Sequence, residues 1–587
     1  MPNCELKTNK SSSLIVAVQY FLSAFLVIII VSVIILSCVP PVSRDALTHH
    51  LAVPKLYLMN GEISEIPSIL FSYYPMNLDL LYMIPLYFGN DIVPKFIHFA
   101  FALLTALLIY MYLKKKLDTL FALIGVLFFL SLPIIVKLSI NVYVDLGLIF
   151  FSTASIISLL KWNESHFQIR YLVLSGIFCG LALGTKYNGL LIFFILAVFI
   201  PIIYVSQSKK RFSDQCVNRK NHSLKHQFGA IGYAAVFGIV SMLVFSPWMI
   251  RNLNWKGNPV YPLYNNWFNS KPSQSIDILE NDVLKNSNNE AVITAKQSSK
   301  RWSPIALRRI IYKETWLEIA LIPIRIFFQG QDDDPKYFDG KLNPFLFLLP
   351  IFAFLHLKND SQTLRFEKKF FLLFTILFIF YAYFQIDMRI RYIAPVIPPL
   401  VILSIMGLHQ IFKSLTNRWK NLPQRTVSLG LLFISIVILA FNLGYLGDLF
   451  TYVRPFSYIS GRIDRDSYIT KYRPEYVALL YSNQNLPDSA KLLGLFLGNR
   501  RYYSDRELVF GNNQFRSIVK NAASHAEILS ALKGRGYTHI LIRFDLFNRW
   551  AALQFNAREK KFLDTFFKKH VRLLIAHRGY GLFQLSI

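Results

Sequence analysis

The sequence predicts a polytopic α-helical membrane protein with about eleven transmembrane helices and a small C-terminal extracytoplasmic α/β domain. Of its 587 residues, 54% are hydrophobic and only 17% are charged, whereas soluble chains carry about 25% charged residues. The apolar residues form runs of about 18 or more, the length that a hydrocarbon layer about 30 Å thick requires. Basic residues gather in short loops between these runs, and this pattern predicts topology.

Placing the basic loops in the cytoplasm gives one consistent path through the membrane. The first apolar run, Ser13 to Val39, is too long for a signal-peptide core, so we expect a retained anchor. The segment Leu78–Phe88 is apolar but short, which favours an interfacial or re-entrant helix. The basic loops lie at 114–116, 209–225, 358–369 and 413–425, and the predicted helices at 13–39, 95–113, 119–137, 143–161, 170–186, 188–206, 229–250, 343–357, 370–386, 391–411 and 427–448.

With the N-terminus in the cytoplasm, an odd number of helices leaves the C-terminus outside. We expect a multi-pass protein of the inner (plasma) membrane, with a membrane module at 1–448 and an extracytoplasmic α/β domain at 449–587. Two external loops, 40–94 and 251–342, interrupt the membrane module. Much of the excess positive charge behind the formal net charge of +29 lies in the short cytoplasmic loops, so no nucleic-acid partner is expected.

The C-terminal domain is predicted from short apolar runs that alternate with helical patterns. Helices are predicted at about 522–533 and 548–569. Strands are predicted at Leu492–Leu497, His539–Ile542, Leu573–Ala576 and Leu582–Ile587. This alternation indicates an α/β fold.

The stretch after the first helix carries the first candidate site residue. Pro40 and Pro41 end the helix, and Asp45 begins what is predicted to be a short amphipathic helix, with His49 four residues on. A carboxylate at the membrane surface can act as a general base on an acceptor bound beside it. Asp is also a favoured helix cap, and from this stretch alone the two interpretations have equal weight.

Two further polar positions lie at predicted external helix ends. Asp145 begins the fourth helix on the same side as Asp45, and two carboxylates there could share a cleft. Lys186 and Tyr187 form a tight turn between two apolar runs. Lys186 could hold a phosphate, or its ammonium could simply reach the membrane interface.

The third group is basic and lies outside, against the usual trend. Arg389 and Arg391 open the tenth helix, and each could bind a lipid-linked phosphate through paired hydrogen bonds or form a salt bridge with Asp387. The run Asp332–Asp334 could bind a hard cation, but a solvated turn closed by Pro335 and Gly340 is favoured.

These residues, in this order and on one side, resemble the GT-C-fold glycosyltransferases that use lipid-linked sugars. The likeness is to the protein-mannosyltransferase and aminoarabinose-transferase branch in its bacterial membrane forms, and it covers essentially the whole chain. It rests on Asp45, Tyr73-Tyr74-Pro75, Asp145, the Gly-Thr-Lys-Tyr turn at 184–187, the Arg-Tyr-x-x-Pro segment at 391–395 and the C-terminal domain.

The resemblance implies transfer of a sugar from a polyprenyl-phosphate carrier to a lipid, glycan or protein acceptor on the outer face, with inversion. It makes Asp45 the candidate general base, with Asp145 assisting. Candidates for the carrier phosphate are Lys55, Lys186, Arg389 and Arg391, and further candidate substrate-binding residues are His49, Tyr74 and Tyr187.

The sequence also departs from the family pattern. Many relatives carry a second acid after the first, but Ala46 follows Asp45, so a divalent metal is possible but not assumed. A Trp-Trp-Asp signature is absent, which argues against transfer of a whole oligosaccharide to Asn. In loop 251–342, Trp302, Arg308 and Arg309 could contact a sugar phosphate, but a short interfacial helix is favoured.

Two other functions remain open from the sequence. A transporter or flippase of a lipid-linked glycan would be expected to carry ionisable residues at mid-membrane depth and broken helices in paired positions. A polysaccharide polymerase or ligase would be expected to place its largest external loop between two late spans. Here the candidate acids lie at helix ends and the C-terminal domain follows the last span, which favours the transferase.

Overall fold

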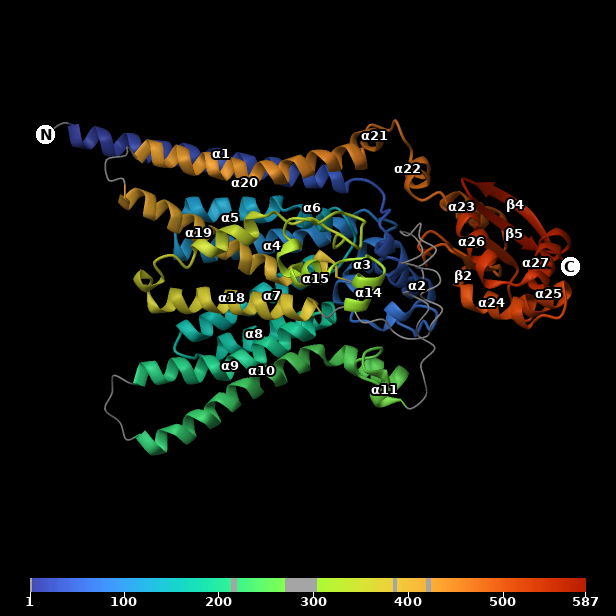
Figure 1. Ribbon diagram of the computed structural model, residues 1–587, viewed down its shortest axis with the longest axis horizontal. Coiled ribbons are helices and arrows are strands. Elements are labelled where there is room, and N and C mark those ends of the chain that lie inside the picture. The colour runs from blue at the N-terminus through green and yellow to red at the C-terminus, as the bar shows by residue number, and fades with distance from the viewer. Residues whose placement is uncertain (1–2, 213–218, 270–303, 384–387, 419–423, 587) are drawn as a thin grey trace.

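A bundle of long helices makes up most of the molecule, and a small sheet domain lies at the end of the bundle remote from the N-terminus (Figure 1). The computed structural model describes residues 3–212, 219–269, 304–383, 388–418 and 424–586. The helices of the bundle are α1 (Asn3–Ser37), α4 (Val93–Lys116), α5 (Thr119–Ser131), α6 (Pro133–Ser139), α7 (Asp145–Glu164), α8 (Ile169–Thr185), α9 (Gly189–Phe212), α10 (Arg219–Lys256), α17 (Phe345–Phe352), α18 (Gln362–Tyr383), α19 (Ile397–Arg418) and α20 (Gln424–Val453).

Short elements join these helices at the end nearer the sheet domain. They are η1 (Ala46–His50), α2 (Ala52–Asn60), η2 (Leu70–Tyr73), α3 (Asn77–Tyr87), α11 (Asn265–Phe268), α14 (Pro304–Ile310), α15 (Trp316–Ala320), α16 (Ile322–Arg325) and η4 (Ile390–Val396), with η3 (Leu357–Asn359) between α17 and α18. The favoured helix at Arg308 and Arg309 is confirmed as α14, whereas Trp302 lies outside the described residues.

Several helices are long and apolar enough to cross a membrane, which confirms the predicted class. Among the described residues seven helices qualify, or eight if the pair α5 and α6, bent by 62°, counts as one span. Helix α8 is apolar but shorter. Each of the eleven predicted ranges overlaps a helix, but the count of eleven stays a prediction.

Burial separates central from peripheral helices. Of the most apolar 18 residues, 89% are buried for the span that contains α19 and 78% for α7, against 22% for α10. Large apolar side chains are exposed on the outer helices, among them Phe21, Phe194, Leu243 and Phe433. Exposed apolar surface of this extent suits contact with lipid tails rather than water.

Helix α3 has eleven residues, too few to span, in agreement with the prediction for Leu78–Phe88. It packs against α8 at Gly184, where an added Cβ would lie 2.3 Å from the Asn77 amide nitrogen. Only glycine permits this approach. The contact fixes the Tyr73-Tyr74-Pro75 stretch beside α8.

The C-terminal domain is a five-stranded mixed sheet of order β2-β1-β3-β5-β4. Strand β1 (Lys491–Leu495) pairs in parallel with β2 (Glu507–Phe510) and β3 (His539–Arg543), while β5 (Tyr580–Leu585) is antiparallel to β3 and to β4 (Val571–His577). The helices are α21 (Pro455–Ile459), α22 (Arg465–Tyr472), α23 (Tyr476–Asn485), α24 (Asn512–Asn521), α25 (His525–Lys533), α26 (Phe544–Gln554) and α27 (Ala557–Lys569).

The predicted α/β domain is confirmed, with two differences in detail. Strand β2 was not predicted, because its four residues form only a short apolar run. The single helix predicted at 548–569 is two helices, α26 and α27. The break occurs because Asn556 caps α27 in a reciprocal capping box with Glu559.

Candidate functional site

A cleft of about 530 Å³ opens where α1, α6 and α20 approach the sheet domain. Its lining includes the apolar side chains Leu36, Val39, Ile134, Leu138 and Leu449. It also includes the charged side chains Arg44, Asp45, Lys137, Asp332, Asp339, Lys341, Arg389, Arg391 and Arg473. Its volume is in the range of small-molecule sites, and the apolar part of the lining suits an attached hydrocarbon chain.

Asp45 lines this cleft and does not cap a helix. The segment after it is a single π-helical turn, closed by the bond from the Leu51 N–H to the Ala46 carbonyl at 2.9 Å. The Asp45 side chain makes no capping bond; its Oδ2 accepts from Nη1 of Arg391 at 2.5 Å. The prediction of an ordinary amphipathic helix is therefore wrong in detail. The interpretation of Asp45 as a helix cap is excluded, because its side chain makes no capping bond. Single π-turns occur frequently at functional sites.

Electrostatics keep the Asp45 carboxylate ionised. Burial acts to raise its pKa, but the charges of Arg391 and Arg389 outweigh burial and hold the pKa well below its ordinary value. Burial and the neighbouring guanidinium groups lower the pKa of Arg44 to about 10, against the opposing effect of Asp45. The guanidinium groups of Arg44, Arg389 and Arg391 thus lie close enough together to affect one another's charge and that of Asp45.

Residues 329–340, here called the acidic strap, contribute Asp332, Asp333, Pro335 and Asp339 to the lining of the cleft. Nζ of Lys137 lies 2.9 Å from Asp332 and 3.3 Å from Asp339, and Arg389 lies 3.2 Å from Asp339. Asp334 accepts from the Lys336 N–H, a turn contact that supports the turn interpretation of this run. Among the described residues no group of three or more His, Cys, Asp or Glu is arranged to hold a metal ion.

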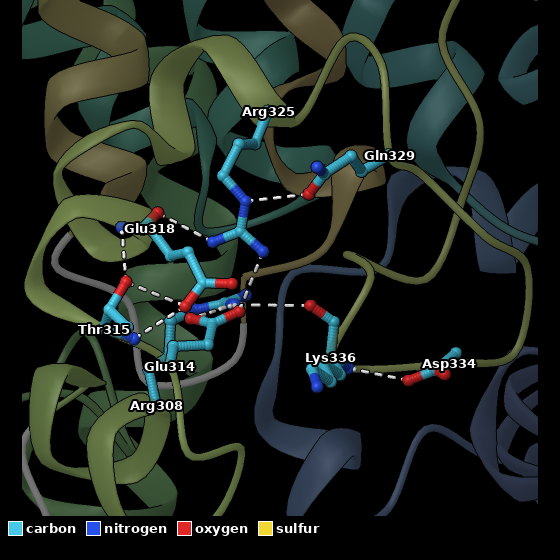
Figure 2. Close-up of polar contacts among 8 residues, drawn as sticks. All are labelled: Arg308, Glu314, Thr315, Glu318, Arg325, Gln329, Asp334 and Lys336. Carbon is cyan, nitrogen blue, oxygen red and sulfur yellow. Dashed lines mark hydrogen bonds and ion pairs between the residues drawn. The ribbon is translucent and has the colours of Figure 1, made fainter.

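A buried ionic cluster anchors the acidic strap (Figure 2). Glu314, 1% exposed, accepts from Arg308 at 2.9 Å and from Arg325 at 3.1 Å. The Arg308 guanidinium also covers the buried Phe338 ring, whose backbone carbonyl accepts from the Ile390 N–H at 2.8 Å. The strap is therefore tied by its backbone to the segment that carries Arg389 and Arg391.

Asp145 lies at the start of α7, buried beside the cleft rather than in its lining. Its Oδ1 binds Nζ of Lys186 at 2.6 Å, and its Oδ2 has no hydrogen-bond partner among the described residues. Arg391 interacts electrostatically with both Asp145 and Asp45. The fold thus brings the two predicted carboxylates together around one arginine, but only Asp45 reaches the cleft. Asp387, the predicted alternative salt-bridge partner of Arg389 and Arg391, lies outside the described residues.

The two adjacent histidines do not line the cleft. His49 stacks on Phe71, with ring centroids 4.3 Å apart. His50 is buried and its Nδ1 lies 2.7 Å from Oδ1 of Asp79. Burial lowers the pKa of His50 to about 4 and raises the pKa of Asp79 to about 7, so the pair is neutral at mildly acid pH.

Tyr74 and Tyr187 belong to an aromatic cluster and do not line the cleft. Their ring centroids lie 5.2 Å apart. The Tyr187 hydroxyl donates to the Tyr261 carbonyl at 2.8 Å, and the Tyr74 carbonyl accepts from Nη2 of Arg251 at 3.1 Å. Nη1 of Arg251 is buried without a hydrogen-bond partner among the described residues, which makes Arg251 a candidate anion ligand that sequence reasoning missed.

Lys55 is turned away from the cleft. All three of its ammonium protons have acceptors in the C-terminal domain: the Tyr502 carbonyl at 2.9 Å, the Ser504 carbonyl at 3.2 Å and Asp505 at 2.6 Å. The structure therefore unites Asp45, Arg389 and Arg391 in one cleft, with Asp145 and Lys186 next to it, and separates Lys55, His49, Tyr74 and Tyr187 from it.

Sequence reasoning also missed Arg44, Lys137, Asp339 and Arg473 in the cleft wall. Lys137 offered a signal, because a lysine at the end of an apolar run needs a partner. Asp339 and Arg473 gave none, because each meets the cleft only through a distant segment.

Comparisons with known proteins agree with this fold. Residues 57–252 match the family model of the dolichyl-phosphate-mannose-protein mannosyltransferases. No curated protein matches the chain.

Solved structures match nearly the whole chain. ArnT from Cupriavidus metallidurans, in the apo state, is 12% identical with a TM-score of 0.51, over 96% of this chain and 97% of that one. ArnT was also solved bound to undecaprenyl phosphate, with a TM-score of 0.50 and the same identity and coverage. The archaeal oligosaccharyltransferase AglB from Archaeoglobus fulgidus, in complex with an inhibitory peptide and a dolichol-phosphate, is 14% identical with a TM-score of 0.52, over 95% of this chain and 74% of that one.

The predicted resemblance is thereby confirmed in its fold and in the family that the chain matches. Because a third of the chain matches the mannosyltransferase model and nearly all of it has the fold of ArnT and AglB, this chain has the GT-C fold, which with the family match indicates a membrane glycosyltransferase that uses a lipid-linked sugar donor.

Proposed function

We propose that this chain transfers a sugar from a polyprenyl-phosphate carrier to an acceptor at the extracytoplasmic membrane surface, with inversion at the sugar carbon. The observation that carries the proposal is the pairing of Asp45 with Arg391 in a cleft lined by both apolar and charged side chains. A lipid-linked sugar phosphate has the matching chemistry, with a hydrocarbon chain beside a charged group.

The reaction proposed is a single displacement. The acceptor hydroxyl attacks the anomeric carbon, its proton passes to Asp45, and the bond from that carbon to the phosphate oxygen breaks. The phosphate keeps the electron pair, and the guanidinium groups of Arg44, Arg389 and Arg391 stabilise the charge that develops there. Asp145, bound by Lys186, places a negative charge near Arg391 from the buried side.

Arg391 has two partners in this scheme. In the structure it neutralises Asp45, which weakens that carboxylate as a base. A donor phosphate competes for the same guanidinium group, because Arg binds phosphate through paired hydrogen bonds. Donor binding would thus free Asp45 for the acceptor proton. Arg251, with its unpaired buried Nη1, is a second candidate for the carrier phosphate.

The acceptor is a lipid, glycan or protein. The proposed location is the inner membrane, with the N-terminus in the cytoplasm and the C-terminal domain outside. That orientation puts the cleft at the outer surface, because the cleft lies beside the C-terminal domain.

The first experiment compares wild type with Asp45→Asn in membranes given radiolabelled polyprenyl-phosphate sugars and native cell-envelope extract. We expect loss of label transfer at normal protein level and membrane insertion. The matched control is Asp118→Asn, because Asp118 only caps α5 and Asn is an equally good cap. Wild-type activity in Asp45→Asn would remove Asp45 from the mechanism. A wild type that moves labelled lipid across proteoliposomes without transferring the sugar would instead establish the flippase.

A further inference from the structure

A loop of the C-terminal domain, residues 499–506 between β1 and β2, docks on the segment that carries Asp45. We call it the docking loop. The Leu47 carbonyl accepts from the backbone N–H groups of Arg501 at 3.0 Å and Tyr502 at 3.1 Å. Leu47 is 2% exposed and belongs to the π-turn that follows Asp45.

Two more carbonyls before Asp45 are bound by the same domain. The Tyr503 hydroxyl donates to the Pro41 carbonyl at 2.8 Å. Nε of Arg473, in the turn between α22 and α23, donates to the Val42 carbonyl at 2.6 Å. The C-terminal domain therefore binds the chain both before and after Asp45 in the sequence, and the residues that donate these bonds are more than 400 positions away.

The Asp45 segment needs such support because its own structure supplies little. Two prolines, which have no N–H to donate, precede it, and one five-residue π-turn follows it. Buried carbonyls must find donors, and these donors come from the C-terminal domain. The position of the Asp45 carboxylate relative to Arg391 thus depends on docking.

Lys55 strengthens the same contact. Its three ammonium protons all go to the docking loop, to the carbonyls of Tyr502 and Ser504 and to the carboxylate of Asp505. Next to it, Asp91 binds Arg465 at 2.5 Å and the Tyr502 hydroxyl at 3.3 Å. With all its donors used, Lys55 has none to offer a carrier phosphate in this arrangement.

We propose that the C-terminal domain positions Asp45 through the docking loop, and that Tyr503 and Lys55 are positioning residues rather than substrate ligands. This inference rests on the proposed function for its activity readout. It also makes a purely structural claim that can be measured without any substrate.

The experiment uses the full chain with Tyr503→Phe, Lys55→Met and the matched control Tyr537→Phe. Tyr537 lies in the same domain, and its hydroxyl donates to Gln514 at 2.8 Å, away from Asp45. Three quantities are measured: the initial rate of label transfer, the affinity for undecaprenyl phosphate, and amide hydrogen exchange in peptides covering 41–51 and 539–543.

We expect Tyr503→Phe, which removes one buried hydrogen bond, to lower the transfer rate about three- to tenfold. Lys55→Met removes three contacts and should lower the rate at least as much. Exchange should rise in 41–51 and stay unchanged in 539–543, with undecaprenyl phosphate affinity unchanged. Tyr537→Phe should leave the rate and the 41–51 exchange at wild-type values.

Three outcomes would overturn the inference. Unchanged exchange in 41–51 would mean that the docking loop does not hold this segment. Loss of undecaprenyl phosphate affinity in Lys55→Met would make Lys55 a phosphate ligand, as the sequence resemblance implies. If Tyr537→Phe lowered the transfer rate and raised the 41–51 exchange equally, the effects of Tyr503→Phe and Lys55→Met would reflect only the general stability of the domain. If the wild type transfers nothing, the proposed function fails, but the exchange result still decides whether docking positions the segment.

Discussion

At the scale of single residues, the pairing of opposite charges determines the properties of the site. Asp45 and Arg391 are 346 positions apart in the sequence and meet at 2.5 Å, both largely shielded from solvent. Arg391 sets the charge state of Asp45, and this dependence can be measured through stability as well as activity.

Replacing Arg391 with Met should reverse the pH dependence of stability that Asp45 contributes. In the wild type the pKa of Asp45 lies below its unfolded value of about 4, so the carboxylate stabilises the fold above that pH and loses this contribution only as pH falls through the folded pKa. Arg391→Met removes the strongest charge that opposes burial, so we expect burial to outweigh the remaining charges, Arg389 among them, and to raise the pKa of Asp45. Stability should then fall as pH rises from about 4 to 7.

Thermal unfolding in detergent at pH 5 and pH 7 measures this change. The control is the double variant Asp45→Asn with Arg391→Met, which removes the titrating group and should lose the added slope. If Arg391→Met alone keeps the wild-type slope, Arg391 does not control the ionisation of Asp45.

For the His50–Asp79 pair, we predict that two substitutions of Asp79 differ in their effect on stability. Because the pKa of Asp79 is raised to about 7 and that of His50 is lowered to about 4, the pair shares one proton at mildly acid pH and carries no net charge. Asp79→Asn keeps an acceptor for His50 and should change the unfolding temperature little at pH 6. Asp79→Leu strands a buried ring nitrogen and should cost about 1–3 kcal/mol.

Unfolding temperatures of both variants at pH 6 test this prediction. A large loss in Asp79→Asn would show that the ionised carboxylate is required. That result would contradict a neutral pair.

At the scale of elements, the acidic strap shows how a segment without long helices is fixed. Three short helices, α14, α15 and α16, precede it, and Arg308 of α14 and Arg325 of α16 converge on Glu314 (Figure 2). The strap then delivers Asp332 and Asp339 to Lys137 and Arg389. The ionic cluster is bonded to the strap directly, because Arg308 donates to the Lys336 carbonyl at 3.3 Å and Arg325 donates to Oε1 of Gln329 at 2.8 Å. The strap is bonded in turn to the segment that carries Arg389 and Arg391.

Glu314→Gln should therefore loosen the strap and lower activity without direct contact with substrate. The change leaves Arg308 and Arg325 buried without a balancing charge, which costs about 3–5 kcal/mol. We expect faster limited proteolysis within 304–340. Glu318→Gln is the matched control, because Glu318 is exposed and contributes only the capping box of α15. Equal proteolysis of both variants would show that the cluster does not anchor the strap.

At the scale of the whole molecule, the helix bundle and the sheet domain form one site. The N-terminus and the C-terminal domain lie at opposite ends of the bundle (Figure 1), which fits the proposed topology. The proposed orientation places the short loop between α17 and α18 in the cytoplasm and the sheet domain outside.

Single-cysteine labelling tests this orientation in a background without native cysteines. Lys358→Cys, exposed in the loop between α17 and α18, should react with an impermeant maleimide only after the membrane is permeabilised. Asp564→Cys, exposed on α27, should react in intact spheroplasts. The reverse pattern would invert the topology and move the cleft to the cytoplasmic side.

The sequence by itself determined the membrane class, the approximate helix positions, the α/β nature of the C-terminal domain and the resemblance that the comparisons confirm. These properties follow from local patterns, because apolar runs, basic loops and strand-length apolar segments are read within one window of the chain. Asp45, Arg389 and Arg391 were each singled out from the sequence as candidate site residues, but that they line one cleft came from the structure, and their chemical roles stay predictions.

Only the tertiary structure decided which partner each charge takes. Asp45 pairs with Arg391 instead of capping a helix, Asp145 is buried against Lys186, and Lys55 binds Asp505, which is 450 positions away. The π-turn at Ala46–His50 and the acidic strap beside the cleft were likewise not predicted. The physical reason is that a buried charge must be neutralised by whatever the fold brings near it, and contacts between distant segments leave no periodic signal in the sequence.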